Sequence, residues 1–265
     1  MEVSMHDYWR FIRAYLLIGL RTVIEYRASF LGQLIGMTIN NGLWLVFWAL
    51  YFQRFPIVQG WTITDLLYLW SILCTSVGLV FGFTANSLTI AEMGQQGGLD
   101  YYLTTPRPVL LHISIAKVSP FNLSDAIFGI VLFVVACHPS WSRLGAFLIA
   151  VLLVAILWYG FLVLLGALCM IAGASQGLSS QIQLFMIHFS TYPGELFGPK
   201  TRIFLLTIIP SVFISSTSVA FVRSPNWTSL LLLAFGAAIF LGLALVAFRA
   251  ALRRYESGNL VTLRG

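Results

Sequence analysis

The sequence predicts an all-α integral membrane protein with six transmembrane helices. Of its 265 residues, 59% are hydrophobic, 15% are aromatic and only 9% are charged. Soluble domains carry roughly 25% charged residues, and a soluble fold could not cover so much apolar surface with so few charges. Several apolar stretches reach the length of roughly 20 residues that a membrane-spanning helix needs. We therefore expect a single transmembrane domain over residues 1–265.

Residues 7–27 precede the first span and have an amphipathic pattern. Apolar and aromatic residues fall at helical spacing on one face, namely Tyr8, Phe11, Ile12, Tyr15 and Ile18. The opposite face gathers Arg10, Arg13 and Arg21. This pattern predicts a helix that lies in the membrane interface with its cations toward the lipid headgroups. The alternative is a basic anchor that does no more than fix orientation.

Six apolar segments follow as predicted spans. They cover about 29–53, 65–86, 118–137, 145–171, 176–193 and 228–250, of which the fourth is the most apolar and the fifth is shorter. The first contains Gly32-x-x-x-Gly36 and the second Gly78-x-x-x-Gly82. Such spacing of glycines permits close approach of helices in a membrane.

Residues 194–227 are apolar enough to enter a bilayer, but Pro210 interrupts them and serines follow. Broken helices at membrane depth are tolerated where they pack against protein or line a cavity. The segment is therefore predicted to be a re-entrant pair of half-helices on the extracytoplasmic side. The alternative, a seventh span, would move the carboxyl-terminal arginines out of the cytoplasm.

The distribution of basic residues predicts the orientation. With six spans, one side of the membrane holds Arg10, Arg13, Arg21, Arg27, Arg107, Arg249, Arg253, Arg254 and Arg264, and the other holds Arg54, Arg143, Lys200, Arg202 and Arg223. Cytoplasmic flanks carry the excess of basic residues. We therefore expect a multi-pass protein of the cell inner membrane with both termini in the cytoplasm. The net charge of +6 is attributed to this orientation, and no nucleic-acid partner is expected.

Motifs for chemistry are missing from the sequence. It has no G-x-x-x-x-G-K-[ST] phosphate loop and no cluster of His, Cys and carboxylate at metal-ligand spacing. We therefore expect no catalytic residues, no metal site and no directly bound cofactor. Ion-coupled carriers place ionisable residues deep in their spans, and here Asp125 alone is plausibly inside one. A structural pair or a carboxylate reaching toward the interface is the expected role of Asp125.

Uncharged polar residues within the spans have two interpretations. They can hydrogen-bond helices to one another, which is the commoner role, or they can line a path for an amphiphilic substrate. We expect the path along the first, second and fifth spans. The candidate lining residues are Asn40, Asn41, Gln181 and His188.

The connection after the second span, residues 87–108, contains "AEMGQQGGLDYYLTTPRP". Ala91 to Gln95 can form a short helix that Gly97 and Gly98 end, and a second can begin at Leu99 before two prolines stop it. Plain helix connections take roughly 2–8 residues, so this longer segment suggests a docking surface. The alternative is an interfacial loop anchored by its two tyrosines.

The chain resembles the ABC type-2 (ABC exporter) permease family over nearly its whole length. The pieces that carry the resemblance are "EYRASF" at 25–30, "GGLDYYLTTPRP" at 97–108, "YPGELF" at 192–197 with "IP" at 209–210, and "LRRYESGN" at 252–259. The resemblance implies six spans, a cytoplasmic coupling helix in the loop after the second span, and a re-entrant segment before the last.

The resemblance also implies partners and site residues. A surface for a separate ATPase subunit would comprise Glu92, Gly98, Asp100, Tyr101, Leu103 and Pro106, with the helix 7–27 beside it. Two permease chains, identical or not, would pair around a path, and ATP and Mg would bind in a dimer of the ATPase subunits. The implied function is ATP-driven export of an amphiphilic or hydrophobic substrate, whether lipid, peptide or drug-like. The alternatives are an ion-coupled secondary carrier without an ATPase and a membrane scaffold.

Overall fold

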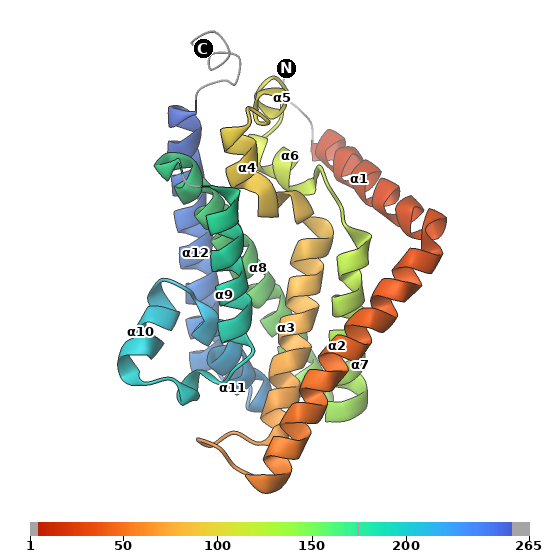
Figure 1. The fold of residues 1–265 in the computed structure, drawn as a ribbon, viewed down its shortest axis with the longest axis vertical. Coiled ribbons are helices and arrows are strands. Elements are labelled where there is room, and N and C mark those ends of the chain that lie inside the picture. The colour runs from red at the N-terminus through yellow and green to blue at the C-terminus, as the bar shows by residue number, and fades with distance from the viewer. Residues whose placement is uncertain (1–4, 174, 256–265) are drawn as a thin grey trace.

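The computed structural model describes residues 5–173 and 175–255, which form a bundle of helices (Figure 1). Within these residues the only β-type pairing is an isolated bridge between Val58 and Trp61. Arg264 and the end of the "LRRYESGN" motif lie outside the described residues. The predicted all-α class is confirmed for the part of the chain that the structure covers.

Five helices are long and apolar enough to cross a membrane among the described residues. They are α2 (Arg27–Arg54), α3 (Ile63–Phe83), the continuous η2–α7 (Pro120–Cys137), α8 (Trp141–Ala172) and α12 (Trp227–Arg254). They match the first four predicted spans and the last. The predicted fifth span corresponds to α9 (Gln176–Ser190), which has 15 residues. At 1.5 Å per residue α9 is about 22 Å long, shorter than the roughly 30 Å hydrocarbon core, so the count of six spans stays a prediction.

The long helices run along the bundle in alternating directions (Figure 1). The beginning of α1 and the end of α12 lie at the same end of the bundle as the connection 84–119, which we call the loop end. The opposite end, called the far end, carries the connections 55–62, 138–140 and 191–226. This arrangement is compatible with termini on one side of a membrane, which is the predicted orientation.

Helix α1 (Met5–Glu25) runs at an angle to the bundle and meets α2 at a sharp corner (Figure 1). The corner lies at Tyr26, which departs from helical dihedral angles with φ −105° and ψ 38°. Phe11 is buried against the loop end, while Arg10 and Arg13 are exposed, in keeping with the predicted amphipathic pattern. Ile18 departs from that pattern because its side chain is exposed.

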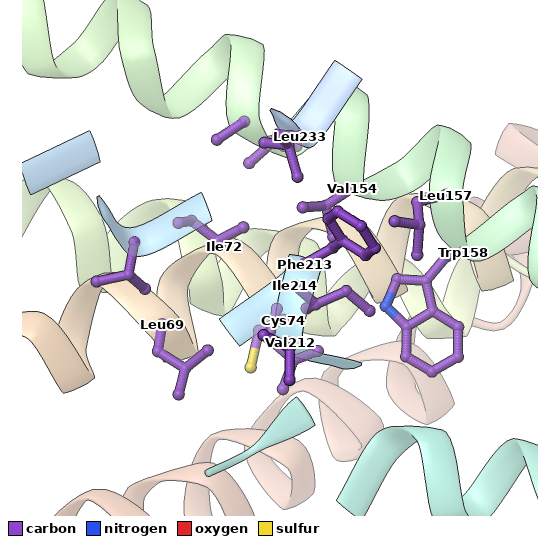
Figure 2. Packing of buried hydrophobic residues seen from close by; sticks show 14 of the residues in the cluster. Leu69, Ile72, Cys74, Val154, Leu157, Trp158, Val212, Phe213, Ile214 and Leu233 are labelled. Carbon is purple, nitrogen blue, oxygen red and sulfur yellow. The ribbon is translucent and has the colours of Figure 1, made fainter. Parts of the chain in front are cut away.

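Helix α8 is the central element of the core, between α3 and α12 (Figure 1). Figure 2 shows Trp158 and Val154 of α8 packed with Ile72 of α3 and with Phe213 of residues 194–227, which we call the far-end segment. Close backbone approach depends on glycines, because a Cβ on Gly160 would stand 2.8 Å from the backbone nitrogen of Leu241. These contacts join α3, α8 and α12 in one closely packed core.

The interrupted segment 194–227 forms η3 (Gly194–Leu196), α10 (Pro199–Thr207) and a helix that joins the π-helical turn η4 (Phe213–Thr217) to α11 (Ser218–Arg223). Pro210 separates α10 from this helix, as expected for a residue that has no amide hydrogen to donate. Both α10 and α11 lie toward the far end (Figure 1). Two half-helices are therefore present, and their re-entrant course through a bilayer stays a prediction.

Candidate functional site

The connection after α3 folds into a compact unit of four short helices, which we call the platform and define as residues 85–115. It consists of η1 (Ala85–Thr89), α4 (Ile90–Gln95), α5 (Asp100–Leu103) and α6 (Val109–Ile115). The two short helices expected here correspond to α4 and α5. Gly97 takes the left-handed conformation between them with φ +75°, which glycine adopts without steric cost. The next residue, Gly98, donates its N–H to the Met93 carbonyl at 2.9 Å.

A separate apolar core lies beneath the platform. The platform contributes Ile90, Leu99 and Ile113, all of them fully buried. They contact α8 and α12 through the small and aromatic residues Val163, Ala167, Ala244, Phe248 and Ala251. Gly166 of α8 allows close contact, since a Cβ there would lie 2.7 Å from the Ile90 Cβ. The platform is thus packed directly on two long helices of the bundle.

Hydrogen bonds fix the platform internally and to α9. The Asn86 amide donates to the Ile113 carbonyl at 3.1 Å and to the Tyr102 hydroxyl at 3.2 Å. Gln176, the first residue of α9, accepts from the Glu92 backbone N–H at 3.2 Å and donates to the Leu88 carbonyl at 2.9 Å. These bonds satisfy backbone groups that short helices leave open, so the platform has a defined shape.

The platform is joined to α1 by an aromatic cluster around the buried His112. Ring centroids 5.0–6.4 Å from its imidazole belong to Phe11, Tyr15, Tyr101 and Tyr102. The Thr105 hydroxyl donates its hydrogen to the Tyr102 carbonyl at 2.8 Å. It can therefore only accept in its 3.1 Å contact with His112, so the hydrogen of that contact belongs to the imidazole Nδ1. Burial, together with the nearby positive charge of Arg107, holds the pKa of His112 below its usual range. His112 is therefore neutral at pH 7 and packs as an aromatic residue.

The end of α12 is tied to the platform as well. The Tyr255 hydroxyl donates to the Asp100 carboxylate at 2.9 Å. Burial, with this hydrogen bond as the next cause, raises the pKa of Tyr255 to about 12. The phenol therefore keeps its proton, and the bond it donates, throughout the neutral range.

The six residues predicted to face an ATPase all lie on the platform but differ in exposure. Gly98, Tyr101, Leu103 and Pro106 are exposed, with 65% of Tyr101 and 44% of Leu103 accessible. Glu92 and Asp100 are partly buried, and each accepts a side-chain hydrogen bond, from Gln96 and from Tyr255 respectively. The exposed part of the predicted surface is therefore largely uncharged. Its role in coupling stays a prediction.

The four predicted path residues do not form one surface. Asn41 is buried and donates to the Asp125 carboxylate of α7 at 3.0 Å, so its amide joins two helices. Asp125 is thus paired structurally, which is one of the two roles expected of it. Asn40 is exposed on the outer side of α2, and Gln181 and His188 are exposed on α9. The packing interpretation therefore describes Asn41, and the path interpretation stays open for the other three.

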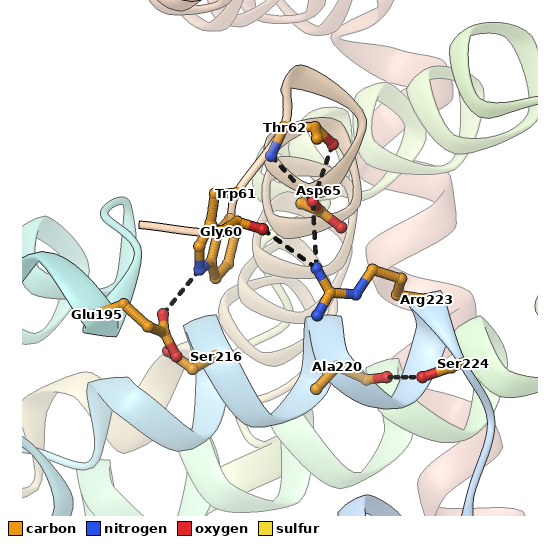
Figure 3. Close-up of polar contacts among 9 residues, drawn as sticks. All are labelled: Gly60, Trp61, Thr62, Asp65, Glu195, Ser216, Ala220, Arg223 and Ser224. Carbon is orange, nitrogen blue, oxygen red and sulfur yellow. Dashed lines mark hydrogen bonds and ion pairs between the residues drawn. The ribbon is translucent and has the colours of Figure 1, made fainter. Parts of the chain in front are cut away.

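A polar network at the far end was not foreseen from the sequence (Figure 3). The Glu195 carboxylate accepts from the Trp61 indole N–H at 2.8 Å and from the Ser216 hydroxyl at 2.9 Å. Beside it, Asp65 caps the start of α3 and forms an ion pair with Arg223 at 3.4 Å. The network connects the 55–62 loop to η3, η4 and α11. The only sequence signal was the presence of two carboxylates at this end of an apolar chain.

A set of three or more His, Cys, Asp or Glu placed to hold a metal ion does not occur among the described residues.

The family profile described as "ABC-2 family transporter protein" matches residues 38–258. Comparison with curated proteins gives no match, and comparison with solved structures gives none either. The matched range begins within α2 and includes the platform, the far-end segment and the whole of α12.

Proposed function

Because the chain belongs to the ABC-2 transporter family, we propose that it is the membrane-spanning permease subunit of an ATP-driven exporter that moves an amphiphilic or hydrophobic substrate. The observation that carries the proposal is the platform. It is an internally hydrogen-bonded unit at the loop end that presents the exposed side chains of Tyr101 and Leu103. Aromatic residues on a rigid surface are enriched in protein interfaces, which supports docking of a separate ATPase subunit there.

A movement of the platform can be transmitted to the bundle through two sets of contacts. One runs through the apolar core beneath Leu99 to α8 and α12. The other runs through His112 to Tyr15 of α1, which continues into α2. ATP binding can drive a change in the permease only if nucleotide stabilises one conformation over another. ATP and Mg would bind in a dimer of ATPase subunits, since this sequence has no phosphate loop.

Pairing with a second permease chain, identical or not, is supported by the exposure of α2. Only 11% of its most apolar stretch is buried. A Cβ built on Gly32 or Gly36 would have no described atom beyond its own helical turns within 4 Å, whereas Gly78 and Gly82 of α3 are packed against Ala126 and Leu123 of α7. Glycines at this spacing suit helix association in membranes. A partner on α2 would place Asn40 beside the path between the two chains.

The basic residues support a cytoplasmic location for the loop end. Arg10, Arg13 and Arg21 are exposed on α1, and Arg253 and Arg254 are exposed at the end of α12. In the inner membrane this asymmetry favours cytoplasmic termini. An ion-coupled carrier is the alternative. Its candidate ionisable residue, Asp125, already accepts a hydrogen bond from Asn41, and a carrier of this kind would give the platform no docking role.

The proposal predicts that Leu103→Arg separates the chain from its ATPase. In an affinity purification from native membranes, we expect an ATPase subunit to accompany the wild-type chain and the variant to recover at least about tenfold less of it, because a charge at the centre of an apolar interface removes a major contact. Ile57→Arg is the matched control, since it charges an exposed aliphatic residue in the far-end loop. Absence of any ATPase from the wild-type sample, or equal loss with both variants, would contradict the proposal.

A further inference from the structure

The outer part of α2 borders a small cavity of about 200 Å³ at the far end. Its walls come from α2, the 55–62 loop and the connection after α9. Most of the lining is aromatic, and the residues are Phe47, Trp48, Tyr51, Phe52, Val58, Trp61, Tyr192, Pro193 and Leu196. We call this cavity the aromatic pocket. None of the structural roles described above explains why so many aromatic rings surround this cavity.

The aromatic pocket has a buried floor and an open rim. The floor consists of Trp48, Phe52 and Trp61, each of which is 6% exposed. The rim includes Phe47 and Tyr51, which are 51% and 36% exposed. An ordinary belt of interfacial aromatic residues presents its rings outward to the headgroups. Here the large rings of the floor are turned inward and bound a cavity, as in a ligand site.

The floor is held in place before any ligand arrives. The Trp48 ring lies 5.8 Å from the Tyr192 ring and 6.1 Å from the Phe52 ring, within the usual range for aromatic pairs. Trp61 is fixed by its backbone bridge to Val58, with N–O distances of 2.9 and 3.0 Å, and by the bond from its indole to Glu195. A pocket formed in advance avoids part of the entropic cost of binding.

The lining of the aromatic pocket is uncharged. None of the residues that line it carries a formal charge. The nearest carboxylate, Glu195, accepts two hydrogen bonds at Oε2 and pairs with Arg202 at Oε1 over 3.4 Å. A charged ligand group inside the pocket would meet no counter-charge among the lining residues and would lose hydration without replacement. The pocket suits an uncharged group.

We propose that the aromatic pocket binds a flat, uncharged ring group, aromatic or fused-ring, of the exported amphiphile. Flat rings offer stacked and edge-to-face contacts to the walls. Sites for complete drug-sized ligands measure roughly 300–1,000 Å³, so this cavity holds one ring system while the remainder of the molecule stays outside. The role in export rests on the proposed function; ring binding by the pocket does not require it. With a second chain on α2, the open rim would face the path near its outer end.

The test is photolabelling of native membranes that contain the full chain. The probe is 3-(trifluoromethyl)-3-(3-iodophenyl)diazirine, a small neutral aromatic compound, and labelled positions are located by mass spectrometry after purification. We expect labelling concentrated on the peptides that contain Phe47 to Phe52 and Tyr192 to Leu196. 2-Naphthalenemethanol should reduce it about fivefold at a concentration of about four times its Kd, by mass action. An excess of 1-decanol, which is apolar but not flat, should leave it unchanged.

Two matched variants locate the binding. Phe47→Ala removes one ring from the rim, so the variant should need about fivefold more 2-naphthalenemethanol for the same protection from labelling. Phe235→Ala removes a ring of similar exposure, 59%, from α12 and should leave protection as in the wild type. Labelling spread evenly over exposed apolar residues, or displaced equally by 1-decanol, would overturn the proposal. If labelling is specific but no ATPase co-purifies with the chain, the proposal of ring binding stands and the proposal of an exporter is refuted. The failure of one proposal can therefore be distinguished from the failure of the other.

Discussion

Gly78→Ala is expected to destabilise the folded chain by about 2 kcal/mol, whereas Gly242→Ala should be neutral or slightly stabilising. A Cβ at Gly78 would overlap the backbone nitrogen of Ala126, so α3 and α7 would have to move apart. At Gly242, which is exposed on α12, a Cβ would have no atom beyond its own helical turns within 4 Å, and alanine improves helix propensity by up to about 1 kcal/mol. The two substitutions are chemically identical and differ only in what surrounds them.

Thermal unfolding of the purified chain in detergent, followed by size-exclusion chromatography, compares the two variants. We expect the midpoint of Gly78→Ala to fall by roughly 5 °C, on the scale of 2–4 °C per kcal/mol for chains of about this size. Gly242→Ala should unfold at or above the wild-type temperature. Equal midpoints for the two variants would mean that α3 and α7 do not pack as closely as described.

Leu99→Asp should detach the platform from the bundle. Leu99 is fully buried among Ile90, Phe248 and Ala251, so the change removes about 2 kcal/mol of apolar burial and introduces a carboxylate without a partner. The long helices do not depend on this small core. We therefore expect hydrogen exchange within residues 90–115 to accelerate at least tenfold, because a loss of about 2 kcal/mol of local stability corresponds to more than a tenfold change in the opening equilibrium. Exchange in α3 and α8 should stay as in the wild type.

Leu99→Met is the control for this experiment, because it keeps an apolar side chain of similar volume, and it should retain most of the wild-type protection. Export driven by ATP should fail with Leu99→Asp and persist with Leu99→Met. Wild-type exchange rates in the aspartate variant would contradict a platform that is held by its apolar core.

The spans and the platform could be predicted from the sequence because local properties determine them. Length and hydropathy identify α8 and α12, and the glycines after α4 with the prolines after α5 delimit the two short helices. The length of α9 was harder to predict. Its polar residues Gln176, Ser179 and Gln183 bond to one another or to the η1 carbonyl of Leu88, so this helix serves the platform as well as the membrane domain.

The role of single polar residues could not be predicted, because it depends on contacts between distant segments. Asn40 and Asn41 are neighbours of the same type, yet one is exposed and the other bonds to Asp125. His112 is one of four scattered histidines, and its aromatic neighbours come from α1 and α5. The glycine pairs of α2 and α3 share one spacing, but among the described residues only those of α3 pack against another helix.

The central claim is that the platform receives an ATPase subunit, and site-specific cross-linking tests it most directly. A photoreactive phenylalanine, p-benzoylphenylalanine, replaces Tyr101 on the platform or, as the control, Trp141, which is exposed at the start of α8 at the far end. Irradiation of native membranes should join position 101 to an ATPase subunit and leave position 141 without that adduct. An ATPase adduct at position 141, or none at position 101 in membranes where the chain is folded, would contradict the account.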